Sequence, residues 1–203
     1  MSEIGLFPLD VVLLPGERVP LHIFEERYKE LIGECLENSD EFGLLLAEET
    51  ELRTIGTSAS VIQVLNRYDD GRMDVVVEGH DRFRVTRVAD TRSYLTAEIQ
   101  PFVDSEAGAD PELVASCMAA LERVAEAAGT DATAIEVRGD EVAWQVAAQV
   151  DFGTEFKQQL LEIQTENERL VQLAEALDEA AIAIARHREI KERAAGNGKV
   201  DHL

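Results

Sequence analysis

The sequence has few cysteines and no long apolar run. Its two cysteines, Cys35 and Cys117, lie far apart within helical patterns, so neither a disulfide framework nor a Cys-x-x-Cys metal site is indicated. No segment approaches the roughly 18 to 20 apolar residues of a membrane span, and the start of the chain has no basic and apolar leader. We therefore predict a cytoplasmic protein without membrane contact. Its 45% hydrophobic residues are enough to build a core.

Basic residues are also scarce. The chain holds 19 Lys and Arg against 41 Asp and Glu, a formal net charge of -22. The excess is spread evenly, with 10 against 20 in residues 1–103 and 9 against 21 in residues 104–203. Nucleic-acid binding relies on a basic face that neutralises phosphates, so we predict no nucleic-acid partner. We interpret the one arginine cluster of the first half as a solvated strand edge; it consists of Arg82, Arg84, Arg87 and Arg92.

Motifs for nucleotide or metal chemistry are absent or incomplete. The segment Gly196-Asn197-Gly198-Lys199 has the wrong spacing for a phosphate-binding loop, and no Ser or Thr follows it. The four histidines lack metal-ligand spacing; they are His22, His80, His187 and His202. We predict no cofactor, no metal and no catalytic residue.

Two weaker catalytic hypotheses have a structural alternative. Cys35 with His22 or His80 would form a nucleophilic pair, whereas a buried helical cysteine is usually a small apolar filler. Adjacent carboxylates could suggest acid–base chemistry, but chain neighbours point in different directions and such runs are usually solvated. These carboxylates are Glu25 with Glu26 and Glu48 with Glu49.

The run Glu78-Gly79-His80-Asp81-Arg82 allows two interpretations. The donor fork of Arg82 could hold a substrate carboxylate or backbone carbonyl. Alternatively, Gly79 permits a tight turn that contains His80, and Arg82 anchors this turn to Glu78 or Asp81. We favour the structural interpretation.

The first half has the pattern of a small β-rich domain. Short branched or aromatic segments bounded by Gly, Pro or Asp predict strands at 11–14, 19–23, 42–47, 59–65, 73–77, 83–88 and 95–99. Asp70-Gly71 predicts a tight hairpin turn. Residues 25–36 predict one helix with an apolar stripe, which should plug or flank a barrel; the stripe is Tyr28, Leu31, Ile32 and Cys35.

The second half predicts helices only. Asp110 is a candidate N-cap with Pro111 at the first helical position, and Gly129 is a candidate stop. Further starts are predicted at Asp140, with a helix through residue 150, at Thr154, and at Thr165 in a capping box with Glu168.

The last and longest predicted helix carries one apolar stripe. Its members are Ile163, Leu170, Leu177 and Ile184, with Leu173 and Ala180 three beyond. We favour packing of this stripe within the chain, and a partner helix or a dimer seam is the alternative. Basic residues crowd the C-terminal end, where cations oppose the helix dipole; they are Arg186, Arg188, Lys191 and Arg193.

Several segments occur together in an order typical of one family. They are Phe7-Pro8-Leu9, Pro15-Gly16, Pro20-Leu21-His22-Ile23-Phe24-Glu25, Ile55-Gly56-Thr57-Ser58-Ala59, Asp69-Asp70-Gly71-Arg72 and Glu78-Gly79 with Arg82-Phe83-Arg84. By these segments the chain resembles the N-terminal substrate-recognition domain of the Lon proteases over about residues 4–102. A weaker similarity extends to about residue 195, through Leu160-Leu161-Glu162 and Glu168-Arg169-Leu170.

This resemblance implies an α+β fold. We expect a PUA-like β pseudo-barrel with one helix at 1–103, a linker at 104–110, and an all-helical domain at 111–195 that ends in a long helix. Residues 196–203 are expected to be a disordered tail. The chain ends where the Lon ATPase and Ser-Lys peptidase domains would begin, so we expect a stand-alone protein without them.

The resemblance also implies a non-catalytic protein-binding module. Its partners would be unfolded or degron-bearing proteins, in the role of an adaptor or holdase-like factor in protein quality control. The alternatives are a specific protein partner, a small-ligand or degron-binding sensor, a stand-alone peptidase, and a homo-oligomer through the long C-terminal helix. The sequence does not identify the residues of a binding surface.

Overall fold

A computed structural model describes residues 2–48, 52–90, 92–105, 108–130, 137 and 141–197. The chain divides into two compact units, Met1–Glu106 with Ala147–Gln164 and Ala107–Val146 with Thr165–Leu203. We call them the barrel unit and the helical unit. The domain boundary at 104–110 stays a prediction, and the compact units differ from it by grouping Ala147–Gln164 with the strands. Within the described ranges, no helix is long and apolar enough to cross a membrane.

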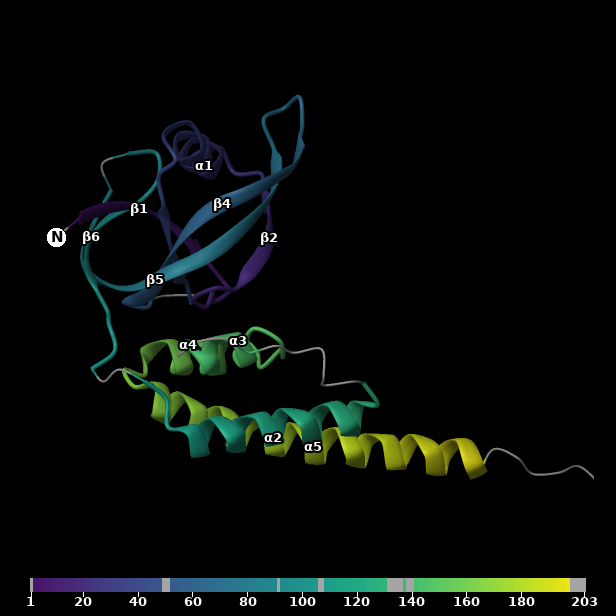
Figure 1. The fold of residues 1–203 in the computed structure, drawn as a ribbon. Coiled ribbons are helices and arrows are strands. Elements are labelled where there is room, and N and C mark those ends of the chain that lie inside the picture. Colours follow the sequence, from purple (N-terminus) through teal and green to yellow (C-terminus); the bar gives the residue numbers. More distant parts are fainter. Residues whose placement is uncertain are drawn as a thin grey trace, which may run out of the picture. The chain divides into compact units, whose positions relative to one another are not determined.

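The barrel unit is built on a six-stranded sheet (Figure 1). Its strands are β1 (Ser2–Leu9), β2 (Arg18–Ile23), β3 (Phe42–Leu46), β4 (Ile55–Arg67), β5 (Met73–Ala89) and β6 (Thr96–Pro101). The strand order is β2-β5-β4-β3-β1-β6, and β6 also pairs with β5. The sheet therefore closes through β5, β4, β3, β1 and β6, with β2 outside the ring against β5. This confirms the predicted β pseudo-barrel.

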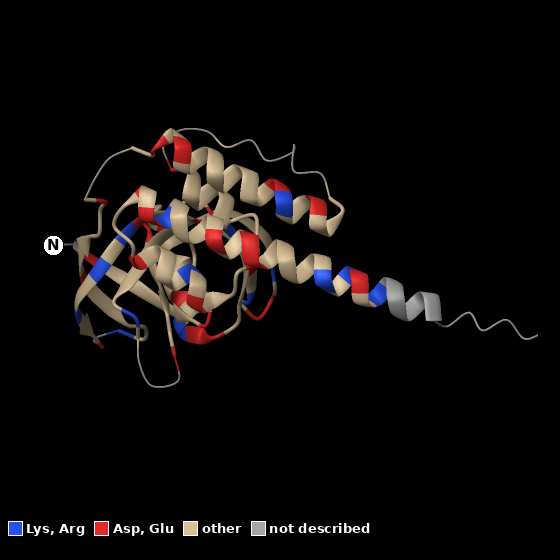
Figure 2. Cartoon of the chain, turned by 90° about the horizontal axis from the view of Figure 1, so that it is seen from below, with Lys and Arg blue, Asp and Glu red and all other residues tan. Residues whose placement is uncertain are grey.

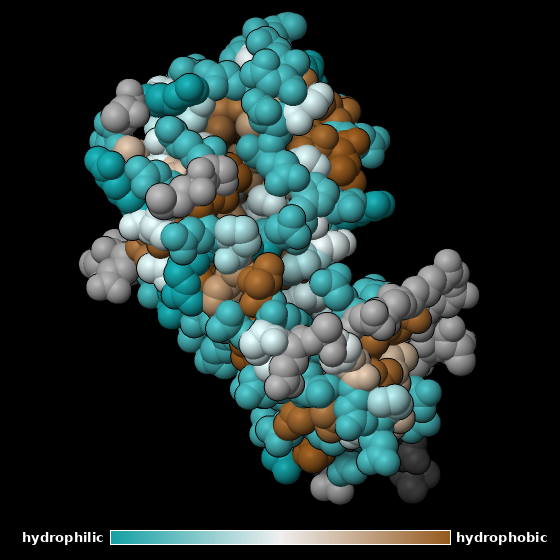
Figure 3. Space-filling view, turned by 60° about the vertical axis from the view of Figure 1, so that its left-hand side comes forward, coloured by the Kyte–Doolittle hydropathy of each residue, from teal (hydrophilic) through white to brown (hydrophobic). Residues whose placement is uncertain are grey.

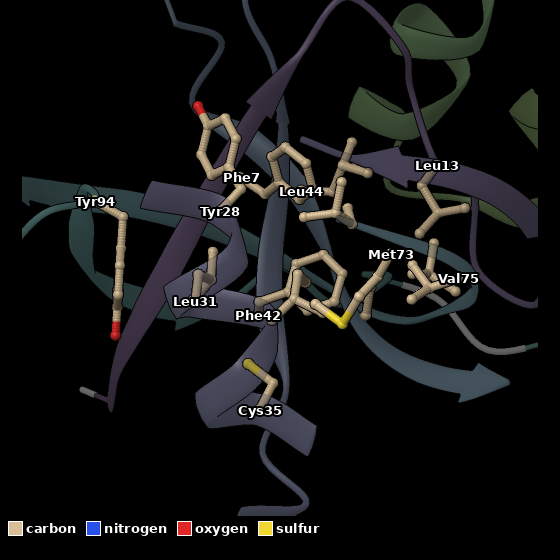
Figure 4. Close-up of a cluster of buried hydrophobic side chains, with 14 residues drawn as sticks. Phe7, Leu13, Tyr28, Leu31, Cys35, Phe42, Leu44, Met73, Val75 and Tyr94 are labelled. Atoms are coloured by element: carbon tan, nitrogen blue, oxygen red, sulfur yellow. The ribbon is translucent and has the colours of Figure 1, made fainter. Parts of the chain in front are cut away.

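Helix α1 (Glu26–Asn38) closes the apolar core of the barrel unit (Figure 4). The predicted stripe is buried, as its spacing required; it consists of Tyr28, Leu31, Ile32 and Cys35. The ring of Tyr28 lies 4.1 Å from that of Phe7 on β1, centroid to centroid. Phe42 on β3 and Met73 and Val75 on β5 complete the same cluster. The apolar residues of α1 recur every three to four positions, so they share one face of the helix. This face packs against the inward side of the sheet, where every second strand residue points.

Two strand predictions are wrong, for one reason. Residues 11–14 form no strand, and β5 runs unbroken through the segment predicted as a turn. A Cβ atom on Gly79 would lie 2.4 Å from the backbone oxygen of Leu14. Gly79 also accepts a hydrogen bond from Gly16 N at 2.8 Å and donates one to Glu17 O at 3.0 Å. Glycine is therefore needed in the strand because the 13–17 segment passes close over it, and not because the chain turns.

The hairpin between β4 and β5 confirms the predicted turn. Gly71 has φ +85°, and its N–H donates to the carbonyl of Tyr68 at 3.0 Å. The N–H of Tyr68 donates to the carbonyl of Arg72 at 2.9 Å. Asp70 supports the turn by accepting from the backbone N–H of Arg72 at 3.2 Å. Glycine supplies the positive φ that this tight connection requires.

Helix α4 (Thr154–Glu162) belongs to the barrel unit. Leu160 and Leu161 are buried, and Gln158 donates to the carbonyl of Ile55 at 3.3 Å. Thr154 was predicted to be the N-cap, but it is the first helical residue and its hydroxyl donates to the Asp10 carbonyl at 3.3 Å. The preceding glycine takes the cap position with φ +76°, a conformation that threonine rarely adopts.

The helical unit holds α2 (Pro111–Ala128), most of α3 (Val142–Ala147) and α5 (Glu166–Asn197). Asp110 caps α2 by accepting from Glu112 N at 2.8 Å, and Gly129 ends it with φ +75°. Both predictions are confirmed. Thr165 accepts from Glu168 N at 3.2 Å, as the capping box predicts. The predicted cap Asp140 lies outside the described residues, as do residues 198–203 of the expected tail.

Helices α2 and α5 pack side by side (Figure 1). Leu170, Leu173 and Leu177 are fully buried, so the central part of the predicted apolar stripe packs inside this unit. Ala180 and Ile184 are half-buried, and Ile163 was wrongly assigned to this helix, because it caps α4 in the barrel unit. Arg169 is also buried; it pairs with Glu166 at 2.8 Å and lies over the Trp144 ring at 4.3 Å. The long final helix confirms the helical part of the predicted fold.

Candidate functional site

Three strands extend from the barrel as a ribbon. Pairing of β3 with β4 ends at Ala59 in the described registers, whereas β4 continues against β5 to Arg67. On its other side, β5 pairs with β2, so that Asp74 faces both His22 and Asn66. The inward side of this ribbon joins the core, and its outward side faces solvent.

The outward side of the ribbon carries unusually exposed apolar side chains. Phe24 is 59% exposed, Leu65 47%, Ile62 43% and Tyr68 42%. Irregular pairing at Val61/Gln63 and Val64/Asn66 is typical of β-bulges, which re-aim side chains. We call these four residues, with His22 and Asp74, the ribbon surface. Figure 3 shows how exposed apolar side chains, in brown, lie among hydrophilic ones on one face of the molecule.

A polar network holds the aromatic part of the ribbon surface. Asp74 accepts from His22 Nδ1 at 2.6 Å, from Asn66 Nδ2 at 2.8 Å and from the Tyr68 hydroxyl at 2.8 Å. The bond from His22, followed by those from Asn66 and Tyr68, lowers the pKa of Asp74 to about 2. The His22 ring stacks on Phe24, with centroids 6.0 Å apart, and meets the edge of Tyr68 at 6.2 Å. One carboxylate thus holds two exposed rings, and Phe24 stacks on one of them.

The edges of the ribbon are poorly suited to strand addition. In the described part of the chain, β2 pairs with β5 alone, but Pro20 removes a backbone donor from its free edge. The free edge of β4 is interrupted by the two irregular positions. Proline and bulges are devices by which proteins block edge-to-edge pairing. Contact with another polypeptide would therefore run through side chains of the ribbon surface.

Arg82 has a structural role, with other partners than the sequence suggested. Its side chain is buried, and its Nη1 donates to the carbonyls of Leu161 at 2.7 Å and Ile163 at 2.6 Å. Its Nη2 pairs with Asp104, and its guanidinium lies 5.0 Å from the Phe102 ring centroid. Neither carboxylate predicted from the sequence fills that role. The arginine joins β5 to the end of α4, within the barrel unit.

The other three arginines of the predicted cluster are exposed but do not form one basic patch. Arg84 lies over the Phe102 ring at 4.8 Å. Arg87 pairs with Glu98 at 3.3 Å, and Arg92 pairs with Glu34 at 2.8 Å. The predicted solvated strand edge, partnered by Asp81, Asp90 and Glu98, is therefore only partly correct. These three arginines are solvated and Arg87 has the expected partner Glu98, but Arg84 pairs with both β4 and β6 and Arg92 lies outside the strands, while Arg82 is buried.

One open pocket lies near Arg84. It measures about 420 Å³ and is lined by Leu52, Arg53, Thr54, Ile55, Arg84, Phe102 and Glu162. Arg53 is engaged there by Glu48 at 2.7 Å and Glu155 at 3.2 Å. Its hydrogen bond with Glu48 raises the pKa of the Arg53 guanidinium, so the charge is kept. This pocket is the place where the small-ligand alternative would apply.

The predicted nucleophilic pair is not assembled. Cys35 is buried in α1, and desolvation raises the pKa of its thiol to about 11, so the reactive thiolate is scarce at neutral pH. His22 pairs with Asp74, whereas His80 lies within β5, not in a turn, and its Nε2 is 2.7 Å from Ser60 Oγ.

The other candidate groups of the sequence make ordinary contacts. Glu25 pairs with Arg27 and Glu26 with Lys29, both at 2.7 Å. His187 is exposed on α5, while Glu49 and His202 lie outside the described residues. Across the described ranges, no three His, Cys, Asp or Glu residues gather in a way that could hold a metal ion.

The family model for the ATP-dependent protease La (LON) substrate-binding domain matches residues 3–179. The chain belongs to this LON substrate-binding domain family. The match spans the barrel unit, α2 and the first part of α5, and it confirms the resemblance found in the N-terminal segments.

Known LON family proteins are similar over different extents. The Lon protease of Buchnera aphidicola is 34% identical over 107 residues, which cover 48% of this chain and 14% of that protein. Lon protease 1 of Hydrogenovibrio crunogenus is 27% identical over 186 residues, or 83% of this chain and 23% of that protein. The chain therefore spans less than a quarter of the length of these relatives.

Solved structures extend the comparison to the LON fold. The Lon N-terminal domain protein from Xanthomonas campestris superposes with a TM-score of 0.67 at 27% identity, over 85% of this chain and 97% of that one. The N-terminal domain of the Mycobacterium avium complex Lon protease gives a TM-score of 0.66 at 22% identity, over 87% and 98%. The second similarity shows the fold alone.

Proposed function

We propose that this chain is a polypeptide-recognition module whose ribbon surface holds apolar segments of protein substrates. The observation that carries the proposal is the exposure of four large apolar side chains on one ribbon, in a chain of the LON substrate-binding domain family. Clustered apolar exposure on a soluble domain marks interaction sites. The role is that of an adaptor or holdase-like factor in cytoplasmic protein quality control.

The geometry of the ribbon surface favours capture of apolar side chains. Phe24 stacks on His22 and Tyr68 meets it in a T-shaped contact, and Asp74 holds both His22 and Tyr68 through hydrogen bonds. Rings that are already oriented lose little conformational freedom on binding. Aromatic residues also contribute more than most types to binding free energy. Leu65 adds an aliphatic contact on the neighbouring strand.

Charge gives this module a second selectivity. With a formal net charge of -22, the chain repels acidic segments and attracts basic ones at long range. The preferred substrate segment is therefore apolar and aromatic with basic flanks. Such segments are buried in folded proteins and accessible in unfolded ones, so recognition would select for the folding state of the substrate.

The proposed role requires no catalysis by this chain. Cys35 and Cys117 are buried thiols whose pKa is raised to about 11 by desolvation, which makes them poor nucleophiles. The contacts of the ribbon surface are hydrogen bonds and ring stacking, which suit binding.

The test is a titration of ribbon-surface variants with a labelled, permanently unfolded protein. The double variant Phe24→Ser with Leu65→Ser is expected to bind about tenfold or more weakly, because aromatic anchors dominate interface energies. The control is Val88→Ser with Val103→Ser, which removes two apolar side chains of similar exposure elsewhere in the barrel unit. Equal weakening in both variants would assign binding to general hydrophobicity and overturn the proposed surface.

A further inference from the structure

The outer face of α5 carries apolar and charged residues in one stripe. Val171, Ile182 and Ile190 are 41%, 61% and 57% exposed. Glu175, Glu179 and Arg186 are also exposed. At 100° per residue these six positions fall within about 100° of one another around the helix. The buried residues Leu170, Leu173 and Leu177 lie on the opposite side, so the stripe points away from the contact with α2.

The charges of this stripe are separated along the helix. Acidic residues occupy its N-terminal half, and basic residues appear toward its C-terminal half together with Glu189, as the red and blue segments of α5 show in Figure 2. Glu175 and Glu179 lie four residues apart on the same face, a spacing at which like charges repel. Glu175 and Arg186 are eleven positions apart, roughly 16 Å along a helix, which is too far for an ion pair within one chain.

An antiparallel second copy of α5 matches this stripe to itself. If Glu175 faces Arg186 of the other copy, the same register places Val171 opposite Ile190, and Ile182 opposite Glu179 beside the symmetry axis. Apolar residues then meet at both ends and opposite charges meet between them. A parallel copy would place Glu175 against Glu175. Two-fold symmetry makes each of these contacts occur twice.

We propose that the outer face of α5 is a homodimer seam, in which a second copy of this chain packs antiparallel with Glu175 against Arg186. The interface rests on a few apolar residues and on ion pairs, so the dimer is weak and sensitive to salt. This seam lies on the side of α5 opposite to Leu170, Leu173 and Leu177, which pack within the chain. It is independent of the ribbon surface.

The first test measures the molar mass of the full chain by sedimentation over a concentration series at low salt. The wild type is expected to pass from monomer to dimer, and the dimer is expected to dissociate in about 1 M salt, where the screening length is short. Glu175→Arg alone or Arg186→Glu alone should abolish the dimer, and the two changes together should restore it. Lys191→Glu is the matched control, because it makes the same charge change outside the stripe.

The second test fixes the orientation. A Val171→Cys chain and an Ile190→Cys chain are treated with a short bismaleimide, separately and mixed, because the native thiols are buried. Antiparallel pairing predicts crosslinked dimers only in the mixture. A wild type that stays monomeric at every concentration would overturn the proposal, as would single reversals that dimerise normally or crosslinks within one unmixed variant. In the monomeric case the stripe would belong to a contact with a different partner.

Discussion

The guanidinium of Arg82 on β5 donates a hydrogen bond of 2.6 Å to the backbone carbonyl of Ile163, 81 positions later in the chain. The same group holds the Leu161 carbonyl and pairs with Asp104. One side chain therefore fixes where the end of α4 meets the barrel. Removing a buried partner of this kind leaves several polar groups unsatisfied.

Arg82→Ala is expected to lower the free energy of unfolding by about 2 to 4 kcal/mol, since it strands two carbonyls and a partly buried carboxylate. Arg84→Ala removes an exposed guanidinium that also contacts the Phe102 ring and should change stability by less than about 0.5 kcal/mol. Urea unfolding of both variants measures the difference. Equal stability of the two would contradict the structural role of Arg82.

Gly79→Ala should destabilise the chain by about 1 to 3 kcal/mol, because the new Cβ would lie 2.4 Å from a backbone oxygen that cannot move aside alone. Gly33→Ala is the matched control on α1, where a Cβ meets nothing within 4 Å. Alanine there is expected to stabilise by about 0.5 to 1 kcal/mol. Thermal unfolding of both variants would show opposite shifts in Tm, and a neutral Gly79→Ala would contradict the close passage of residues 13–17.

The network around Asp74 predicts a pH dependence. The carboxyl has a lower pKa in the folded state, about 2 against 3.8, so its contribution is complete above pH 4 and is lost as the pH falls toward 2. Asp74→Asn should therefore be less stable than the wild type at pH 7, and the two should converge near pH 2. If the difference in unfolding free energy between the wild type and Asp74→Asn stays constant from pH 7 to pH 2, the charge of Asp74 is not the source of that difference.

Burial of both thiols predicts slow chemical modification. Cys35 and Cys117 each have a pKa raised to about 11, with desolvation as the main cause. A colorimetric disulfide reagent at pH 8 should label the folded chain far more slowly than the chain in denaturant, because both access and thiolate are limited. Rapid labelling of one thiol in the folded state would reopen the nucleophile hypothesis.

Local chemistry made the helices predictable. Asp110 and Gly129 bound α2 because capping depends on a few adjacent residues. The unbroken strand β5 was missed because an isolated glycine in a sequence suggests a turn. Gly79 is instead needed because the backbone of Leu14, 65 positions away, passes close to it. The partners of Arg82 were missed for the same reason, since Ile163 lies in the other half of the chain.

The ribbon surface could not be found by alternation alone. Leu65 fits a period-two strand, but it lies at the irregular pairing between Val64 and Asn66, where its side chain is 47% exposed. That pairing is set by the partner strand. Phe24 follows β2 directly, and its exposure depends on how the chain enters α1. The sequence contained one sign of this surface: apolar residues continue up to the Asp70-Gly71 turn, whereas hairpins usually have polar residues near their turns.

The central claim is that this chain recognises unfolded polypeptide. The most direct measurement is a fluorescence-anisotropy titration of the purified chain with a labelled, permanently unfolded protein, and with the same protein in its folded form. The account predicts saturable binding to the unfolded form and at least about tenfold weaker binding to the folded form, since apolar segments are accessible only in the former. No binding to either form, or equal binding to both, would contradict it.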